Sequence, residues 1–201
     1  SMGADEIGIS LLYALGTRIF IKKVIGFTGG YGNENMVEIA EMCAIHSIDV
    51  VVVEDNFGDG MFKKLLEPHI LKHSPRTDVE GIKVTGQKEV RIIEALEPIM
   101  NQHRLVVSKE VFEHDVTVKT TIYSFGYQLS RISRARDSLK HDDRLDSVAN
   151  GVTYLMEYLA DDEDRIMEYH VEQEAQKVLE YTLGRFQNKQ RQGNLNFGQR
   201  F

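Results

Sequence analysis

The chain has 201 residues, of which 42% are hydrophobic and 27% charged, and its formal net charge is −7. This length fits one medium-sized domain or one domain with an appendage, and the composition is ordinary for a soluble globular protein. The negative charge argues against a nucleic-acid coat that relies on positive charge over its whole surface, although a local basic strip or bound metal ions stay compatible with DNA binding. The one cysteine, Cys43, excludes an intrachain disulfide and favours a reducing compartment.

Neither a bilayer-spanning apolar run nor a signal peptide is visible in the sequence. The opening Ser1-Met2 resembles a cloning remnant, so we expect the chain to be part of a longer protein. Alternating apolar residues predict strands over 7–15 and 18–27, which the turn at Gly16-Thr17 would join into an antiparallel hairpin. A helix up to about residue 46 follows from the helical spacing of Met36, Ile39, Ala40 and Cys43.

Strands and helices are predicted to alternate along the rest of the chain up to residue 134. Its expected elements are a strand over 49–53, a helix over 60–72, an extended piece over 80–85, a helix over 88–102, a strand over 104–107 and a helix over 121–134. Pro98 lies inside the 88–102 pattern, so we expect that helix to kink or end early.

The run Val50-Val51-Val52-Val53 has no alternation, which predicts a strand with two apolar faces in the middle of a sheet covered by helices. It stops at Glu54 and Asp55, and a glycine-rich turn follows. Ligands of open α/β sheets bind at the carboxyl ends of such strands, so Glu54 is a candidate functional residue. The alternative is that these carboxylates are the solvated end of a strand.

A second acidic stretch covers residues 141–146. The apolar face formed by Leu145, Val148, Ala149, Val152, Met156 and Leu159 predicts a helix that starts near Asp142 or Asp143. Asp143 and Asp146 are three residues apart and therefore project from the same side. A helix N-cap explains one aspartate. Asp146 borders the apolar face and needs a partner or a cation.

Carboxylates from separate elements favour hard divalent ions, which prefer oxygen ligands and bind substrate phosphates. Two such ions about 4 Å apart can drive phosphodiester cleavage. A serine hydrolase lacks its nucleophile motif and zinc lacks its usual ligands, so both are less well supported. The basic residues Arg131, Arg134, Arg136 and Lys140 are either a solvated face or a phosphate-contacting strip, and with Lys88 they are our candidate DNA-binding residues.

Several ordered motifs resemble the nuclease domain of tailed-phage terminase large subunits, with the best likeness to the DNA maturase of podophages. They cover residues 3–6, 54–62, 86–93, 96–107 and 141–146, and the likeness extends over roughly residues 3–160. The resemblance implies an α/β, ribonuclease H-like fold with a central mixed β-sheet flanked by helices. It also implies a metal-dependent endonuclease that cuts concatemeric double-stranded viral DNA during packaging in the host cytoplasm.

The resemblance also implies roles for individual residues. Glu54 matches the metal-bridging glutamate, Asp143 and Asp146 match the late aspartates, and Asp5 matches an auxiliary acid, so two magnesium or manganese ions are expected. The family's principal aspartate ends a first strand that would precede Asp5, and this chain does not contain it. We therefore expect the sheet to lack that strand, and metal binding and cleavage to be weak unless Asp5 substitutes.

The expected organisation is a nuclease domain over residues 1–160, followed over 161–201 by a helix and a flexible tail. The resemblance implies as partners double-stranded DNA, a preceding ATPase domain in the intact chain, the portal and the small terminase subunit, with no membrane. Two other hypotheses about the function stay open. One is a nuclease-fold docking module that binds the portal or DNA without chemistry, and the other is a different ribonuclease H-like enzyme such as a resolvase or transposase.

Overall fold

The structure is a computed structural model that describes residues 6–56 and 60–160. The chain divides into two compact units, residues 1–156 and 157–201, and the first contains all strands of the described residues. The helix and tail predicted over 161–201 lie outside the described residues. No helix in the described part is both long and apolar enough to cross a bilayer.

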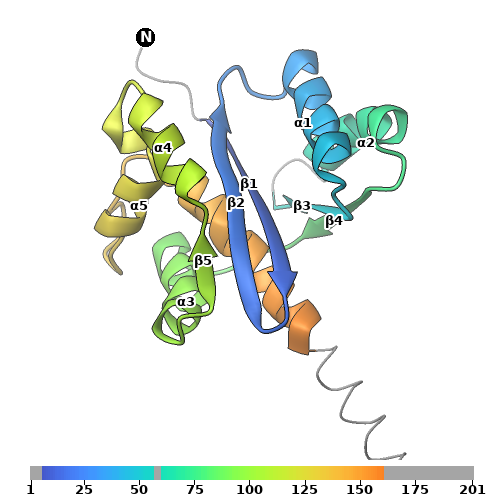
Figure 1. The fold of residues 1–201 in the computed structure, drawn as a ribbon. Coiled ribbons are helices and arrows are strands. Elements are labelled where there is room, and N and C mark those ends of the chain that lie inside the picture. The colour runs from blue at the N-terminus through green and yellow to red at the C-terminus, as the bar shows by residue number, and fades with distance from the viewer. Residues whose placement is uncertain (1–5, 57–59, 161–201) are drawn as a thin grey trace, which may run out of the picture. The chain divides into compact units, whose positions relative to one another are not determined.

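Strands and helices alternate along the first unit, which confirms the α/β class (Figure 1). A helix over residues 143–160, orange in Figure 1, follows the labelled elements and is called the 143–160 helix. The labelled elements are β1 (Ile7–Leu15), β2 (Arg18–Phe27), α1 (Asn33–His46), β3 (Val50–Glu54), α2 (Met61–His73), β4 (Asp78–Ile82), α3 (Lys88–Asn101), β5 (Leu105–Val107), α4 (Lys109–Thr117), a 3₁₀ turn (Thr121–Tyr123) and α5 (Phe125–Arg131).

The strands form a mixed sheet and a separate strand pair. β1 and β2 are the predicted antiparallel hairpin, and β5 pairs in parallel with β2. β3 and β4 pair in parallel with each other. The prediction that β3 lies in the middle of a sheet is therefore wrong for the described residues, where it pairs with β4 alone. Only Val53 of its four valines is buried, and the other three are half-buried. A run of valines therefore does not require a strand that is covered on both faces, because valine also suits a half-buried pleated surface.

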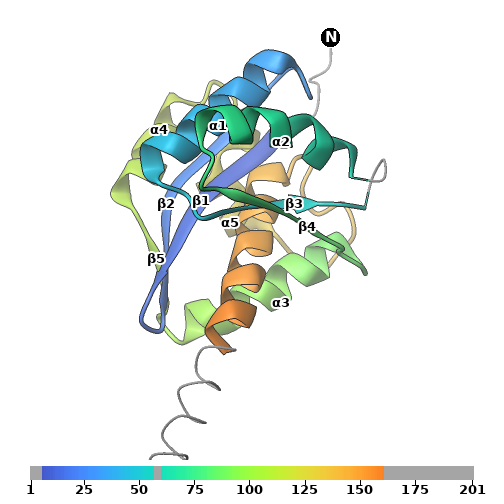
Figure 2. The same ribbon diagram turned by 90° about the vertical axis from the view of Figure 1, so that its right-hand side faces the viewer.

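The two faces of the hairpin pack against different helices. Ile7, Ile9, Ile25 and Phe27 belong to a core that α1 and α2 complete with residues such as Met36, Ile39, Leu66 and Ile70. On the other face, Gly8 and Leu12 lie against the 143–160 helix. Figures 1 and 2 show α1 and α2 together on one side of the strands, and the 143–160 helix on the other.

A β-bulge makes this division possible. The pairing passes from Leu11 with Lys23 to Leu12 with Ile21, so Lys22 is an extra residue on β2. Side chains alternate strictly along a strand, and one extra residue reverses which face the following residues occupy. Ile19 and Ile21 consequently share the face of Val24 and Leu12, and both isoleucines are fully buried there.

Two helix predictions need correction, and one helix was not predicted. Pro98 lies within α3 without ending it, because proline removes a single backbone hydrogen bond and Leu96 and Ile99 on either side of it are buried. The helix predicted over 121–134 is a 3₁₀ turn followed by the short α5. Helix α4 was not predicted, since Val111 is its only buried residue and leaves no apolar stripe.

Candidate functional site

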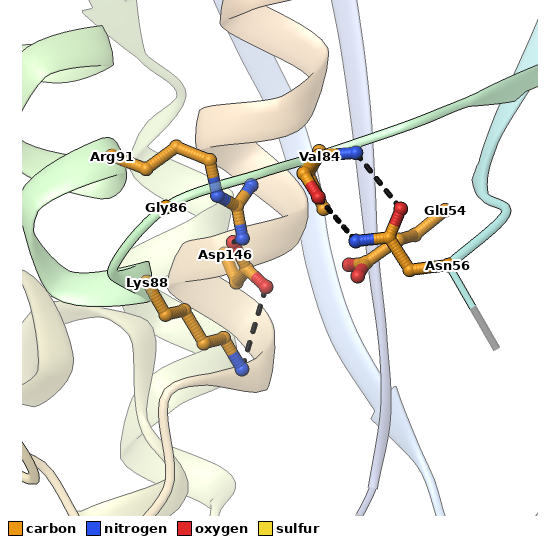
Figure 3. A pocket seen from close by; sticks show the side chains of 7 residues that line it. All are labelled: Glu54, Asn56, Val84, Gly86, Lys88, Arg91 and Asp146. Carbon is orange, nitrogen blue, oxygen red and sulfur yellow. Dashed lines mark hydrogen bonds and ion pairs between the residues drawn. The ribbon is translucent and has the colours of Figure 1, made fainter.

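Two walls that carry carboxylates enclose a cavity of about 180 Å³ (Figure 3). Glu54 lies on one wall, at the end of β3, and Asp146 lies on the other, in the first turn of the 143–160 helix. The structure therefore brings together acidic side chains that are 92 positions apart in sequence. The cavity is lined by Glu54, Asn56, Val84, Gly86, Lys88, Arg91 and Asp146.

The Glu54 wall is held by a pair of hydrogen bonds between the Asn56 side chain and the Val84 backbone, which we call the Asn56 clasp. The Asn56 side chain accepts a hydrogen bond from the Val84 backbone N–H at 3.0 Å and donates another to the Val84 carbonyl oxygen (Figure 3). The backbone N–H of Asp55 donates to the Ile82 carbonyl oxygen at 2.8 Å. These bonds fix the segment after β3 to the segment after β4. Within the described residues Glu54 has no ion-pair partner, so its carboxylate is available to a ligand.

The opposite wall depends on two glycines that pair across the hairpin, Gly8 and Gly26. A Cβ atom on Gly8 would lie 2.1 Å from the Asp143 carbonyl oxygen, and one on Gly26 would lie 1.9 Å from a Glu6 carboxylate oxygen. Only residues without a side chain allow this approach. Gly8 therefore allows the start of the 143–160 helix to pack directly on the hairpin, and Gly26 leaves room for the side chains of Glu6 and Arg144.

A buried ion pair anchors the same turn. The Arg144 guanidinium donates from Nε to Glu6 at 3.0 Å and from Nη2 at 3.3 Å. The exposed fractions of the two side chains are only 5% and 11%. Arg144 Nη1 has no hydrogen-bond partner, so the pair is incompletely satisfied. The ion pair orients the turn that carries Asp143 and Asp146, one residue before and two residues after Arg144.

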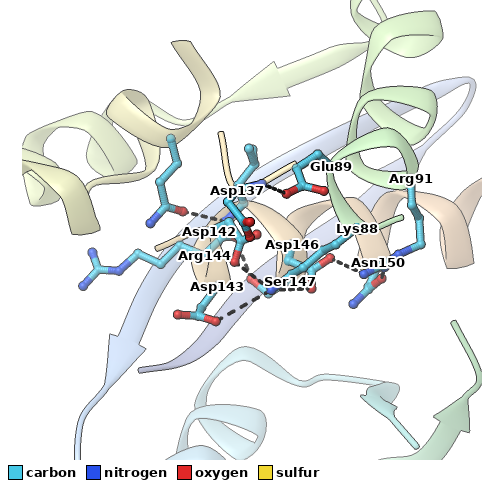
Figure 4. A network of polar contacts seen from close by, with 12 residues as sticks. Lys88, Glu89, Arg91, Asp137, Asp142, Asp143, Arg144, Asp146, Ser147 and Asn150 are labelled. Carbon is cyan, nitrogen blue, oxygen red and sulfur yellow. Dashed lines mark hydrogen bonds and ion pairs between the residues drawn. The ribbon is translucent and has the colours of Figure 1, made fainter. Parts of the chain in front are cut away.

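Two cations from α3 reach into the acidic turn (Figure 4). The Lys88 ammonium lies 2.7 Å from Asp142, 3.4 Å from Asp146 and 3.9 Å from Asp143. The Arg91 guanidinium contacts the other Asp146 oxygen at 2.8 Å and also donates to Asn150. Asp146 thus has the cationic partners that its position beside the apolar stripe required.

Burial and charge oppose each other in this cluster. Burial raises the pKa of Asp146, and the nearby charges of Lys88 and Arg91 counteract that rise. Burial by itself would lower the pKa of the Lys88 ammonium, but the charges of Asp146, Asp142 and Asp143 outweigh it and raise the pKa. Lys88 is therefore a firmly protonated cation within the acidic turn.

The donor set suits a hard divalent ion by its chemistry, because it consists of carboxylate oxygens beside a polar cavity. The cavity is much larger than one water molecule requires, so an ion could keep some of its waters. In the residues that the structure describes, no three His, Cys, Asp or Glu side chains converge closely enough to hold an ion. Lys88 and Arg91 lie among the aspartates, and Asp5 falls outside the described residues.

The four arginine and lysine residues predicted as a basic strip are all exposed. Arg131 ends α5, whereas Arg134, Arg136 and Lys140 lie in the segment that connects α5 to the 143–160 helix. Hydrogen bonds tie this segment to the start of α3, from the side-chain amide of the N-cap residue Gln87 to the Arg134 carbonyl oxygen at 3.0 Å and from the Asp137 N–H to Glu89 at 2.6 Å. Lys88, also predicted to contact DNA, lies in the acidic cluster with 39% of its side chain exposed.

Arg91, Asp142 and Asn56 are not among the site residues predicted from the sequence. Arg91 follows Lys88 by three positions and shares its helix face, which is a signal that could have identified it. Nothing local marks Asn56, because its partner Val84 is 28 residues away.

Comparison with known proteins places this fold in a family. The family described as bacteriophage T7 terminase, ribonuclease H-like domain, matches residues 1–105, just over half of the chain. The chain belongs to this family. The ribonuclease H-like fold and the likeness to terminase nuclease domains are thereby confirmed.

Over 160 residues the chain is 38% identical to the protein named terminase, large subunit, of Enterobacteria phage T3. The alignment covers 76% of this chain and 27% of the phage T3 protein. The chain thus spans little more than a quarter of this curated relative, and it contains both acidic stretches of the candidate site.

Proposed function

We propose that this domain is a divalent-metal-dependent endonuclease that cuts double-stranded DNA. The observation that carries the proposal is the meeting of Glu54 and Asp146 across one polar cavity in a ribonuclease H-like terminase domain. Carboxylates from two separate elements that face one cavity repel each other unless a cation lies between them.

In this proposal Glu54, Asp143 and Asp146 hold the metal, and Asp5 is a further candidate ligand. Magnesium or manganese, as two ions, would supply a water of lowered pKa and stabilise the leaving oxygen. The chain's own contribution is positional. The Asn56 clasp fixes the Glu54 wall, and the ion pair between Arg144 and Glu6 fixes the aspartate wall.

The basic residues Arg131, Arg134, Arg136 and Lys140 would bind the DNA backbone. The attachment of the segment that contains Arg134 and Arg136 to the start of α3 supports this, because the start of α3 carries Lys88 at the cavity wall. Phosphate contacts of this kind position a duplex without reading its sequence. Replacing Arg131 and Arg136 together by glutamine should weaken duplex binding and lower its dependence on salt.

The phage T3 relative suggests the biological role. We propose that the domain acts within a longer large terminase subunit in the host cytoplasm and cuts concatemeric viral DNA during packaging. An ATPase domain of the same chain, the portal and the small terminase subunit would be its partners.

Nicking of supercoiled plasmid in magnesium or manganese tests the proposal. Glu54→Gln and Asp146→Asn should each lower the metal-dependent rate by about a hundredfold or more, since each removes a charged ligand. Glu38→Gln is the matched control, because Glu38 is an exposed carboxylate on α1, away from the cavity lining. Circular dichroism would verify that each variant is folded.

Equal nicking by Glu54→Gln and the unsubstituted chain would contradict the assignment of the site. A chain without any metal-dependent cleavage, whose affinity for DNA or portal is intact, would instead be the docking module considered from the sequence. A strong preference for branched over linear duplex would point to a resolvase-like enzyme.

A further inference from the structure

The acidic turn holds two cations that metal coordination alone does not explain. Four carboxylates, Glu54, Asp142, Asp143 and Asp146, lie at the cavity or in contact with Lys88. With every carboxylate ionised, the charges of Lys88 and Arg91 leave a formal total of −2. One divalent ion would neutralise this total, and a second would leave an excess of positive charge in a partly buried site.

We propose that Lys88 controls how many divalent ions the site holds. While its ammonium lies among the aspartates the site takes one ion, and a second ion binds strongly only after the ammonium has left. This inference rests on the proposed function, because it concerns the same metal site.

The two cations differ in how easily they can leave. Arg91 bridges Asp146 and Asn150 through two guanidinium nitrogens, and 19% of its side chain is exposed. Lys88 ends in one ammonium on a flexible four-carbon stem, and 39% of its side chain is exposed. Lys88 can therefore swing toward solvent through rotation about its own side-chain bonds, whereas Arg91 would have to break a planar two-point contact.

Helix stability does not explain why a lysine occupies this position. Lys88 is the first residue of α3, where the helix dipole disfavours positive charge. Its ion pairs are also partly exposed, and exposed pairs contribute little to folding. The three aspartates within 4 Å are what hold the ammonium there. A second divalent ion would compete with the Lys88 ammonium for the same carboxylate oxygens, so that second ion and the ammonium exclude each other.

Calorimetric titration with manganese, supported by electron paramagnetic resonance of free manganese, tests the proposal without measuring cleavage. The variants are Lys88→Met and Lys88→Gln, which remove the charge, and Lys88→Arg, which keeps it. Lys109→Met is the matched control, because Lys109 also lies 2.7 Å from a carboxylate, that of Glu113, but away from the cavity lining. Circular dichroism and thermal unfolding verify folding before titration.

We expect the unsubstituted chain, Lys88→Arg and Lys109→Met to bind one manganese ion each. Lys88→Met and Lys88→Gln should bind a second ion, with an affinity about tenfold to a hundredfold above that of any second ion in the unsubstituted chain. Equal stoichiometry and affinity in all five proteins would overturn the inference and leave the proposed metal site intact. Weaker manganese binding by both charge-removing variants would also overturn it. Absence of binding in every protein would refute the metal site itself, and the inference with it.

Discussion

Substitution of Gly8 by alanine is a direct test of how the aspartate wall is built. A Cβ atom at this position would lie 2.1 Å from the Asp143 carbonyl oxygen, 2.4 Å from the Asp143 carbonyl carbon and 2.9 Å from the Arg144 backbone nitrogen. All three atoms belong to the backbone, so no side-chain rotation can relieve the contact. The start of the 143–160 helix would have to move away from β1.

The structure gives the size of this movement. The contact must open by about 1.3 Å to reach the 3.4 Å at which ordinary van der Waals contact begins. Overpacking of a well-packed interior typically costs 1–3 kcal/mol and sometimes more, and a backbone clash belongs at the upper end. We therefore expect Gly8→Ala to lose about 3 kcal/mol, which lowers Tm by roughly 6–12 °C in a chain of this size.

Thermal and urea unfolding, followed by circular dichroism, measure this effect. Gly32→Ala is the matched control, because its backbone has a φ of −65° and its nearest neighbour would lie 3.7 Å from the new Cβ atom. We expect the control to stay within about 1 kcal/mol of the unsubstituted chain. If Gly8→Ala unfolds within about 2 °C of the unsubstituted chain, the close seating of the helix on the hairpin is wrong.

Three further predictions concern the interior. Glu6→Ala should destabilise the fold by about 3–5 kcal/mol in urea titration, because Arg144 would remain buried without its partner; a loss under 1 kcal/mol would contradict this. Leu66→Ala should cost about 2–5 kcal/mol in the same assay, since Leu66 is fully buried among α1, α2 and β3, and a neutral result would show that this core is loosely packed. Burial raises the pKa of Cys43 to about 11, so at pH 8 its thiolate fraction is smaller than usual. Ellman's reagent should accordingly label Cys43 in denaturant but not in the native chain, and rapid native labelling would refute its burial.

The hairpin and α1 could be predicted from the sequence because their apolar periodicity is local information. Glu54 could be placed at a strand end and Asp146 beside a buried stripe for the same reason. The predicted roles of Glu54, Asp143 and Asp146 in metal binding stay predictions, as do the DNA contacts of the basic residues.

Other features depend on tertiary contacts that no local pattern reveals. Lys88 meets Asp142 across 54 positions, so its place in the acidic turn was not visible from either stretch. The helix predicted to continue to residue 134 ends at Arg131, and Asp137 in the following segment adopts a left-handed φ of 55°. Hydrogen bonds from that segment to the α3 turn stabilise it in place of a further helical turn.

The extra residue at Lys22 has a consequence for how this hairpin can vary in length. Deleting it would restore strict alternation and turn Ile19 and Ile21 toward the wrong layer, although every apolar side chain would still be present. An added residue between Val24 and Phe27 would do comparable harm. Homologous hairpins should therefore accept exchanges of one aliphatic residue for another far more readily than a change of one in residue count, except at the tip around Gly16.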